Sequence, residues 1–425
     1  MGDSRHDKPG QLRGQLPGQL PGPLTDQLPA ELPVALVFGL LFALFSLALS
    51  RIYPERVYTH IDVFYNADVL RVIRDLTEPG AYHDRLSVHP AFSILLMPFG
   101  LLLTKIGLSA KAAAHLLIAA STAASASLFY LTCHNIGLRR RDAALMMALL
   151  ASSAALMFWG STVDTFCFSG LSFALVYFIA SSKIDNRLAW IGVSAFTMAM
   201  TTTNWITALI ATAIRRRGRE ALIISAGALV TVVLLSLLQK LLLPTAALFF
   251  IPQSFGDEKH YLAAPSLERL INFFLFTGVA AEPERLLQLT DTAGGPAGIG
   301  PWVRSGAAIT LLHPVRLVAA GSWLLLTLNG LRQCLPGSAL EARPRQLAWI
   351  AALVLLFELC FHQFWGDEPF LYSAHYLPTF ITLIALGFCG RQGRASRVLA
   401  VVFVVSAFGA NLQALLSAGQ ALAAG

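Results

Sequence analysis

Apolar runs long enough, or nearly long enough, to cross a lipid bilayer recur along the whole chain and limit what it can fold into. A membrane-spanning helix needs about 20 mainly apolar residues. Because 56% of the residues are hydrophobic and only 13% are charged, a soluble core could not bury this much apolar surface. We therefore expect an all-α polytopic membrane protein. The runs lie at about 33–50, 88–107, 112–133, 142–160, 164–181, 188–214, 221–243, 313–331, 346–362, 376–390 and 397–418.

Clusters of lysine and arginine between these runs indicate the orientation of the chain. Such clusters stay in the cytoplasm, so the net charge of +7 is explained by membrane topology rather than by nucleic acid. If every run crossed once, the triplet at 139–141 would face outward. The clusters are at 139–141, 183–187, 215–219, 332–345 and 391–397.

The triplet at 139–141 faces the cytoplasm if two of the runs do not cross the membrane exactly once. Segment 89–103 contains Pro90 and Pro98, which favours a re-entrant or interfacial segment in the outer leaflet. Run 188–214 has basic clusters at both ends and the sequence TTTN at 201–204, so we expect two short spans that meet at an outer turn. The result is about eleven transmembrane helices, with amphipathic helices in outer loops and the N-terminus inside.

The same pattern divides the chain into four parts. Residues 1–32 include a Gly/Pro/Gln/Leu low-complexity run and are expected to form a disordered cytoplasmic tail. Residues 33–243 form an N-terminal transmembrane module, 244–312 a large extracytoplasmic loop, and 313–425 the C-terminal transmembrane helices. The five cysteines form no CxxC pair, which argues against a disulfide framework or a zinc site.

The first outer loop opens with THIDVFYNADVLRVIRDL, residues 59–76, in which Asp62 and Asp68 follow a strongly apolar segment. Helical spacing of its apolar residues predicts an amphipathic surface helix over about 62–77. Thr59 and Asp62 fit a capping box. Asp68 precedes Arg71 by three residues, which predicts a solvated ion-pair ladder. Each acid therefore also has a purely structural explanation.

Other outer segments add polar residues at the same membrane depth. Asp164 lies in a short turn between two apolar runs without a basic neighbour, and an acid there is costly unless it is paired or used. A set of acids, imidazoles and arginines gathered on one face is a better site candidate than one acid alone. The other candidates are Arg85, His89, Arg304, His313, Arg316, Asp367, Glu368, His375 and Tyr376.

These residue types fit glycosyl transfer from a lipid-linked phosphosugar. A carboxylate can remove the proton of an acceptor hydroxyl or amine while the phosphate departs. Arginine suits the phosphate because its fork donates two hydrogen bonds and keeps its charge. We expect Arg85, Arg304 and Arg316 in this role, with His89 and His313 as helpers. The inner loops contain no Gly-rich phosphate loop, which argues against a nucleotide-driven reaction in the cytoplasm.

Four of these segments together resemble a known family. HIDVFYNAD, VHPAFSILLMPFG, GLRRRD and STVDTF occur in the order seen in the amino-terminal module of the GT-C superfamily of membrane glycosyltransferases. That superfamily includes protein O-mannosyltransferases and lipid A aminoarabinose transferases. The resemblance implies that Asp62 is the catalytic carboxylate and Asp164 its second-loop partner. It also implies that the large outer loop, with the amphipathic stretch 267–276, covers the lipid donor.

The chain departs from the family in two ways. The first loop lacks a tight acidic pair, which leaves the identity of the catalytic acid open, and no large soluble domain follows the last span. The missing domain argues against an oligosaccharyltransferase that selects sequons.

The expected function is inverting transfer of a sugar from a polyprenyl-phosphate donor to a lipid, glycan or protein acceptor, outside a bacterial inner membrane. No nucleic acid partner is expected. The cofactor considered is a divalent metal ion held by Asp62, Asp164 and the pair Asp367–Glu368, although no ligand spacing demands one. A transporter or flippase of a lipid-linked glycan is the second reading; it predicts inverted repeats and charges at mid-membrane. A non-catalytic scaffold is the third.

Overall fold

The computed structural model of the protein describes residues 28–59, 64–251, 262–280, 282–285, 303–306, 313–366, 370–389 and 393–424. Within these residues, six helices are long and apolar enough to cross a membrane, so the all-α membrane class is confirmed. The full set of eleven crossings stays a prediction. The six are α1 (Leu28–Leu49), α5 (Ala110–Asn135), α11 (Gly218–Leu242), α14 (Pro314–Leu331), α15 (Ala342–Phe364) and α17 (Gly393–Ala424). The first of them begins inside the range that the sequence assigned to the tail.

Shorter helices complete the bundle and its outer loops. The apolar ones are α4 (Phe92–Lys105), α8 (Phe166–Ser181), α9 (Arg187–Met200), α10 (Trp205–Arg215) and α16 (Ser373–Phe388). The others are α2 (Arg56–Thr59), α3 (Val69–Thr77), α6 (Arg140–Ser152), α7 (Ala154–Trp159) and α12 (Leu267–Leu275). Strands β1 (Glu282–Arg285) and β2 (Val303–Gly306) form one antiparallel hairpin in the large outer loop, which the sequence pattern did not predict.

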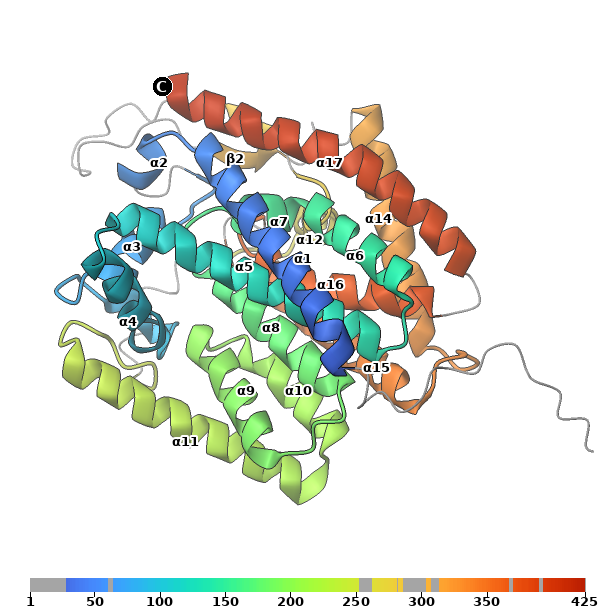
Figure 1. Ribbon diagram of the computed structural model, residues 1–425, viewed down its shortest axis with the longest axis horizontal. Coiled ribbons are helices and arrows are strands. Elements are labelled where there is room, and N and C mark those ends of the chain that lie inside the picture. Colours follow the sequence, from blue (N-terminus) through green and yellow to red (C-terminus); the bar gives the residue numbers. More distant parts are fainter. Residues whose placement is uncertain are drawn as a thin grey trace, which may run out of the picture.

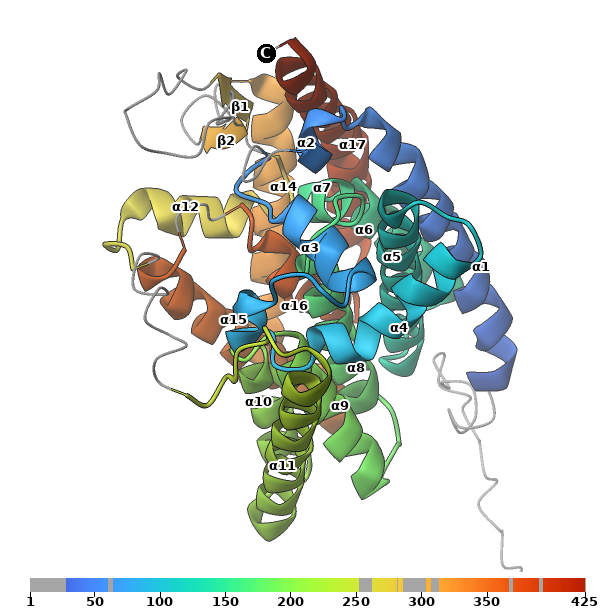
Figure 2. The ribbon, with the colours of Figure 1, turned by 90° about the vertical axis from the view of Figure 1, so that its left-hand side faces the viewer.

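Helix α16 occupies the centre of the bundle, and nearly all of its residues are buried. It packs against α8, α14 and α15, while α5 packs against α8 on one side and α1 on the other (Figure 1). Helices α9, α10 and α11 lie along one side of the bundle, and α14 and α17 lie along the opposite side (Figure 2). Helices α1 and α11 keep large exposed apolar surfaces, as expected of helices that face lipid.

The predicted break in run 188–214 is confirmed. Helix α9 ends at Met200 and α10 begins at Trp205, with the turn of residues 201–204 between them. The backbone N–H of Thr202 donates to the carbonyl of Val88 at 3.0 Å, so this turn lies beside the first outer loop. The turn therefore joins the group of segments predicted to face outward.

Contacts divide the loops into two groups, as charge patterning predicted. Ion pairs join the basic clusters to acids at one end of the bundle. These pairs are Arg140–Glu31, Arg397–Asp142, Arg187–Glu220 and Arg216–Asp185. At the other end, the hydroxyl of Tyr53 contacts Ser161 at 2.9 Å and the indole of Trp159 donates to the carbonyl of Phe370 at 2.9 Å. Loops that are far apart in sequence and were predicted to face outward therefore meet there.

Two local expectations for the first outer loop are wrong. The surface helix α3 begins at Val69, not near residue 62, and Thr59 is the last residue of α2 rather than a helix N-cap. Left-handed backbone at Tyr65 and Asn66, with φ of 50° and 60°, keeps the intervening segment from continuing as a helix. A capping box of Thr59 and Asp62 at the start of that helix is thereby ruled out, although Asp62 itself lies outside the described residues.

Candidate functional site

The first outer loop and the turn before α8 meet at two aspartates. The backbone N–H of Asp68 donates to Oδ2 of Asp164 at 2.9 Å. The other oxygen of Asp164 accepts from the backbone N–H of Thr165 at 2.5 Å and from its hydroxyl at 3.1 Å. The turn at Tyr65 and Asn66 delivers Asp68 to this position. Asp164 is 1% exposed, so an acid buried between two apolar helices is satisfied by a loop 96 residues away in the chain.

Asp68 also begins a chain of charged side chains along α3. Arg71 donates to Oδ2 of Asp68 at 2.6 Å and to Oδ2 of Asp75 at 2.9 Å, as helical spacing predicted. Oδ1 of Asp75 lies 2.6 Å from Nδ1 of His83. The ladder is not solvated, contrary to the expectation, because Asp75 and His83 are each 1% exposed. Asp75 lies on the buried apolar face of α3 and His83 packs against it. Their contacts therefore hold the Arg71 guanidinium in place instead of forming ion pairs in solvent.

The two aspartates have opposite tendencies to ionise. Burial raises the pKa of Asp164 to about 7, and the charge of Asp68 adds to this shift. Burial also opposes ionisation of Asp68, but the charge and hydrogen bond of Arg71 outweigh it and hold the pKa of Asp68 below its ordinary value. The side chain of Asp68 is still 38% exposed, so its carboxylate is partly accessible. The pair thus combines an accessible carboxylate with a neighbour that can take up a proton near neutral pH.

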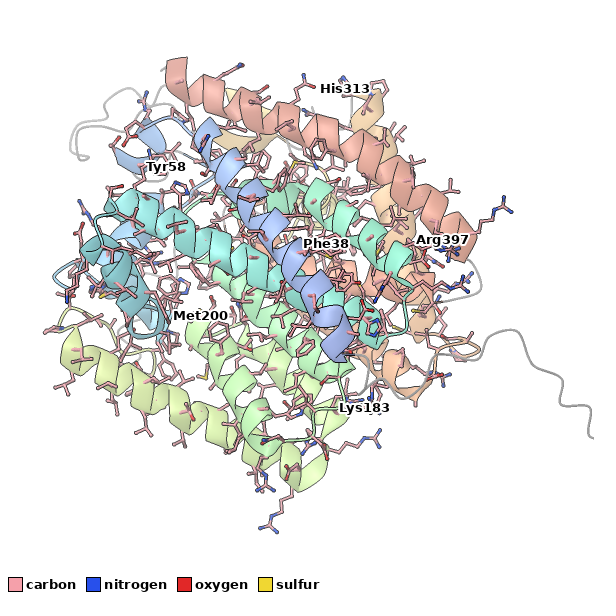
Figure 3. The ribbon with its side chains drawn as sticks, in the orientation of Figure 1. Phe38, Tyr58, Lys183, Met200, His313 and Arg397 are labelled. Atoms are coloured by element: carbon pink, nitrogen blue, oxygen red, sulfur yellow. The ribbon has the colours of Figure 1, made fainter. Side chains whose placement is uncertain are left out.

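His89 and Arg85 are within electrostatic range of Asp68. Nδ1 of His89 is 2.6 Å from the carbonyl of Met200, the last residue of α9, which Figure 3 labels. A carbonyl only accepts, so Nδ1 carries the hydrogen and Nε2 keeps its lone pair. Burial lowers the pKa of His89 to about 3, with the charges of Arg71 and Arg85 adding to the shift. Arg85 also acts electrostatically on Asp68, and it is half-buried.

The start of α16 approaches the site from the other side of the bundle. The ring of His375 lies 4.8 Å from that of Phe166, two residues beyond Asp164. His375 is also within electrostatic range of His89. Tyr376 is buried against Phe273 of α12, with ring centroids 4.4 Å apart, which confirms the predicted amphipathic helix in the large outer loop. His375 therefore joins the candidate site, whereas Tyr376 lies between it and α12.

The remaining predicted residues lie on α14, on β2 or outside the described residues. His313 is exposed at the start of α14 (Figure 3), and Arg316 is buried one turn further along a helix that packs mainly on α16 and α17. Arg304 lies on β2, where only the backbone is described. Asp62, Asp367 and Glu368 lie outside the described residues. Their assignments stay predictions.

Arg71, Asp75 and His83 are site components that the sequence reasoning missed or dismissed. Their spacing in VLRVIRD had been explained by an exposed helix, and His83 had no role. The available signal was a strongly amphipathic segment in which Asp75 falls between apolar Val72, Ile73 and Leu76, on the buried side. An acid on an apolar face predicts a buried partner.

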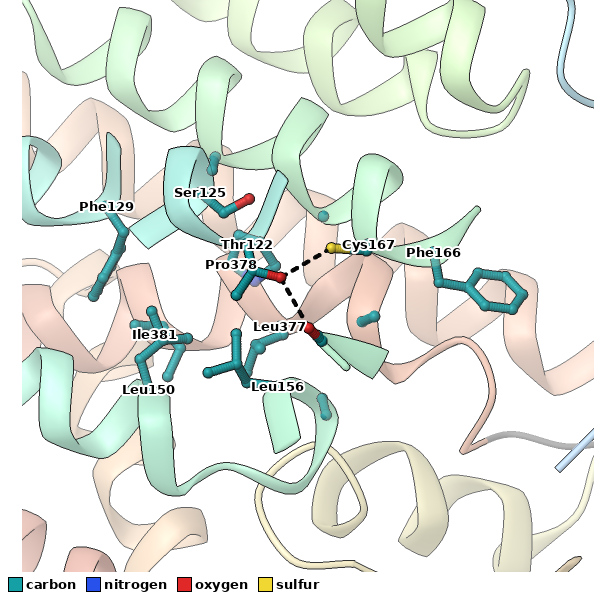
Figure 4. A pocket seen from close by; sticks show the side chains of 15 residues that line it. Thr122, Ser125, Phe129, Leu150, Leu156, Phe166, Cys167, Leu377, Pro378 and Ile381 are labelled. Carbon is teal, nitrogen blue, oxygen red and sulfur yellow. Dashed lines mark hydrogen bonds between the residues drawn. The ribbon is translucent and has the colours of Figure 1, made fainter. Parts of the chain in front are cut away.

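The described part of the chain has a small apolar cavity and no cluster of metal-ligating side chains. Its His, Cys, Asp and Glu side chains include no group of three that could hold a metal ion. An apolar cavity of about 50 Å³ lies among α5, α7, α8 and α16, next to the hydrogen bond from Thr122 to the carbonyl of Gly160 (Figure 4). This volume is far below the roughly 300–1,000 Å³ of a ligand pocket, so the cavity is a packing gap beside the site.

The fold and the site define an α-helical membrane protein with one buried and one partly exposed aspartate, an arginine and imidazoles where its predicted outer loops meet. Comparison with models of protein families, with characterised proteins and with solved structures gave no match.

Proposed function

We propose that the protein transfers a sugar from a polyprenyl-phosphate donor to an acceptor at the outer face of a bacterial inner membrane, as a GT-C-type glycosyltransferase. The observation that carries the proposal is the hydrogen bond that the backbone N–H of Asp68 donates to Oδ2 of Asp164 at 2.9 Å. It joins the first predicted outer loop to the acid of the second, beside Arg71; the sequence resemblance implies that these two loops meet, but with Asp62 as the acid of the first loop.

The described residues have different roles in the proposed reaction. In the proposed reaction the carboxylate of Asp68 accepts the proton of the acceptor hydroxyl or amine. Asp164, held by the backbone N–H of Asp68, is a second group that can take up a proton near neutral pH. The acceptor atom forms a bond to the anomeric carbon from the face opposite the phosphate. The bond from that carbon to the phosphate oxygen breaks, and the phosphate departs with the electron pair. Arg85 and the edge of Arg71 stabilise its charge.

Asp62 lies in the same loop and is the acid that the sequence favoured as the base. Asp62 and Asp68 are therefore alternative candidates for the general base. The hydrogen bond from the backbone of Asp68 to Asp164 favours Asp68. Substitution of each acid separates them.

The test is transfer of label by the purified protein in lipid nanodiscs, with a panel of labelled polyprenyl-phosphate sugars and membrane-lipid, glycan and peptide acceptors. We expect Asp68→Asn and Asp164→Asn to lower the rate of transfer roughly 10²- to 10⁴-fold, the usual contribution of a general base. Asp62→Asn is measured beside them. Glu78→Gln is the matched control, because Glu78 is exposed at the end of the same helix.

Two results would contradict the proposal. One is a wild-type protein that moves no label from any donor of the panel to any acceptor. The other is full activity of Asp68→Asn and Asp164→Asn with correctly folded protein. A large loss in Asp62→Asn alone would move the base to Asp62 and leave the reaction class standing.

One observation favours transport of a lipid-linked glycan as the second candidate. Glu358 lies on α15 six residues before the helix ends and is 3% exposed, whereas the sequence suggested that charges occur only at the ends of spans. Buried acids within spans are common in proton-coupled transporters. Transport in proteoliposomes without transfer of label would support this candidate instead.

A further inference from the structure

The first residues of the large outer loop are hydrogen-bonded to the first outer loop. Residues 244–247, which we call the loop stem, follow directly after α11. The hydroxyl of Thr245 donates to the carbonyl of Ala81 at 2.8 Å and accepts from the backbone N–H of His83 at 3.2 Å. The backbone N–H of Ala247 donates to the carbonyl of His83 at 3.3 Å. The loop stem therefore binds the backbone of His83 on both sides.

His83 connects the loop stem to the charged side chains of α3. Nδ1 of His83 lies 2.6 Å from Oδ1 of Asp75, and Arg71 donates to Oδ2 of Asp75 at 2.9 Å. Arg71 also donates to Oδ2 of Asp68 at 2.6 Å, and the backbone N–H of Asp68 donates to Asp164 at 2.9 Å. Each step is a direct contact. An unbroken series of hydrogen bonds therefore joins the large outer loop to the two aspartates.

The contact between His83 and Asp75 is enclosed in the protein. The side chains of His83 and Asp75 are 0% and 2% exposed. A carboxylate oxygen accepts, so Nδ1 of His83 carries the hydrogen of this bond. Because the imidazole is enclosed, we assign it no contact with substrate. Its effect is on Asp75, since a donor that holds one carboxylate oxygen fixes the direction in which the other oxygen meets Arg71.

A second contact from α11 holds the other end of the same loop segment. Gln239 is 0% exposed and lies within the last turn of α11. Its side-chain amide donates to the carbonyl of Pro90 at 3.0 Å, and its oxygen accepts from the backbone N–H of Ile94 at 3.0 Å. Pro90 directly follows His89 of the candidate site. The end of α11 and the loop stem therefore hold both ends of segment 81–94.

We propose that Thr245 and His83 are positioning residues, through which the loop stem holds the Arg71 guanidinium where the donor phosphate departs. This role rests on the proposed glycosyl transfer. Arg71 is fixed only when both of its carboxylate partners are fixed, and His83 fixes Asp75. A displaced guanidinium stabilises the departing phosphate less well, so loss of the contact lowers the rate of the chemical step.

The first test does not depend on glycosyl transfer. Amide hydrogen exchange of the protein in lipid nanodiscs is measured by mass spectrometry at the backbone N–H of Asp68, which is bonded to Asp164. We expect Thr245→Val, which removes the hydroxyl and keeps the shape, to raise this exchange rate several-fold. Thr245→Ser keeps the hydroxyl and should exchange as the wild type does. The control is Thr231→Val, because the Thr231 hydroxyl donates to the carbonyl of Gly227 within α11.

Thr245 is exposed, so Thr245→Val is expected to fold. An exchange rate at Asp68 that is unchanged in Thr245→Val, or raised equally in Thr231→Val, would overturn the proposal.

The second test follows turnover in the label-transfer assay. We expect His83→Leu to lower kcat about tenfold, and His83→Asn, whose amide can donate in place of Nδ1, to recover most of this loss. Because His83 acts through Arg71, adding His83→Leu to Arg71→Lys should lower kcat by less than about threefold more. A general loss of stability would instead multiply the two effects and would not be recovered by His83→Asn.

The two tests separate this role from the reaction itself. Faster exchange in Thr245→Val without any transfer of label by the wild type would keep the link to Arg71 and refute the proposed function. Transfer of label in which the losses of His83→Leu and Arg71→Lys multiply would refute the positioning role and leave the function standing.

Discussion

At the scale of single residues, the surroundings of Asp164 and Asp68 separate two chemically identical groups. For Asp164, burial and the charge of Asp68 oppose ionisation and outweigh the hydrogen bonds that it accepts, while Asp68 is held ionised by Arg71. Folding therefore favours the protonated form of Asp164. Since its pKa in the fold, about 7, lies above its ordinary value of 3.8, this contribution to stability is present below about pH 4 and is lost as the pH rises through about 7.

The activity should depend on pH in the opposite sense. A protonated pair cannot accept another proton, so we expect kcat/KM to fall as the pH decreases through about 7. Thr165→Val removes the hydroxyl that donates to Oδ1 of Asp164 at 3.1 Å. Because that hydrogen bond favours the ionised form, its loss should move the acidic limb of the profile to higher pH.

Thr162→Val serves as the control for this shift, because the Thr162 hydroxyl contacts the phenol of Tyr53 at 2.8 Å and the carbonyl of Phe158 rather than Asp164. An acidic limb that stays in place in Thr165→Val, or moves equally in both variants, would show that Asp164 does not control the profile.

At the scale of elements, the position of the site depends on how α3 lies on α4. Gly100 of α4 faces the backbone at the end of α3, and a Cβ at this position would lie 2.0 Å from the carbonyl oxygen of Leu76. Only glycine permits this approach. Helix α3 determines the positions of Asp68, Arg71 and Asp75. Its close contact with α4 therefore determines where these three residues lie relative to Asp164.

Gly100→Ala should therefore push α3 away from α4. We expect a loss of unfolding free energy of about 1–3 kcal/mol from overpacking, together with a lower rate of transfer. Thermal unfolding in detergent and the label-transfer assay measure the two effects.

Gly192→Ala provides the comparison, because this glycine is in the middle of α9 with nothing within 4 Å of the added Cβ. There the substitution should stabilise by up to about 1 kcal/mol through helix propensity. Equal behaviour of the two variants would exclude a steric role of Gly100.

At the scale of the whole molecule, the loops fall into two groups at opposite ends of the bundle. Acids neutralise the basic clusters at one end, and the aspartate pair lies among the loops at the other. This separation is what the positive-inside rule requires of a site that works outside the cytoplasm.

Cysteine labelling tests the orientation that follows. In a Cys360→Ser background, which removes the exposed native thiol, Glu78→Cys should react with an impermeant maleimide on intact cells. Glu341→Cys should react only after the membrane is permeabilised. Labelling of both positions from the same side, or the reverse pattern, would contradict the assignment of the faces.

Periodicity and charge placement were sufficient to predict an all-α membrane protein, the break between α9 and α10, and the gathering of the outer loops. These features follow from local composition: apolar length determines what can enter lipid, and basic residues determine which loops stay inside. The start of α3 was mispredicted because left-handed backbone at Tyr65 is a tertiary outcome, and helical spacing continues through it in the sequence.

The chain by itself determined which residues could do chemistry, since acids, histidines and arginines are scarce among so many apolar residues. Only the tertiary structure decided which of them act together. The partner that the first loop supplies to Asp164, and the meeting of His89 with the end of α9, join segments far apart in the chain. Hydrophobic spacing specifies which face of a helix is buried, but the identity of its neighbour depends on how all the helices pack at once.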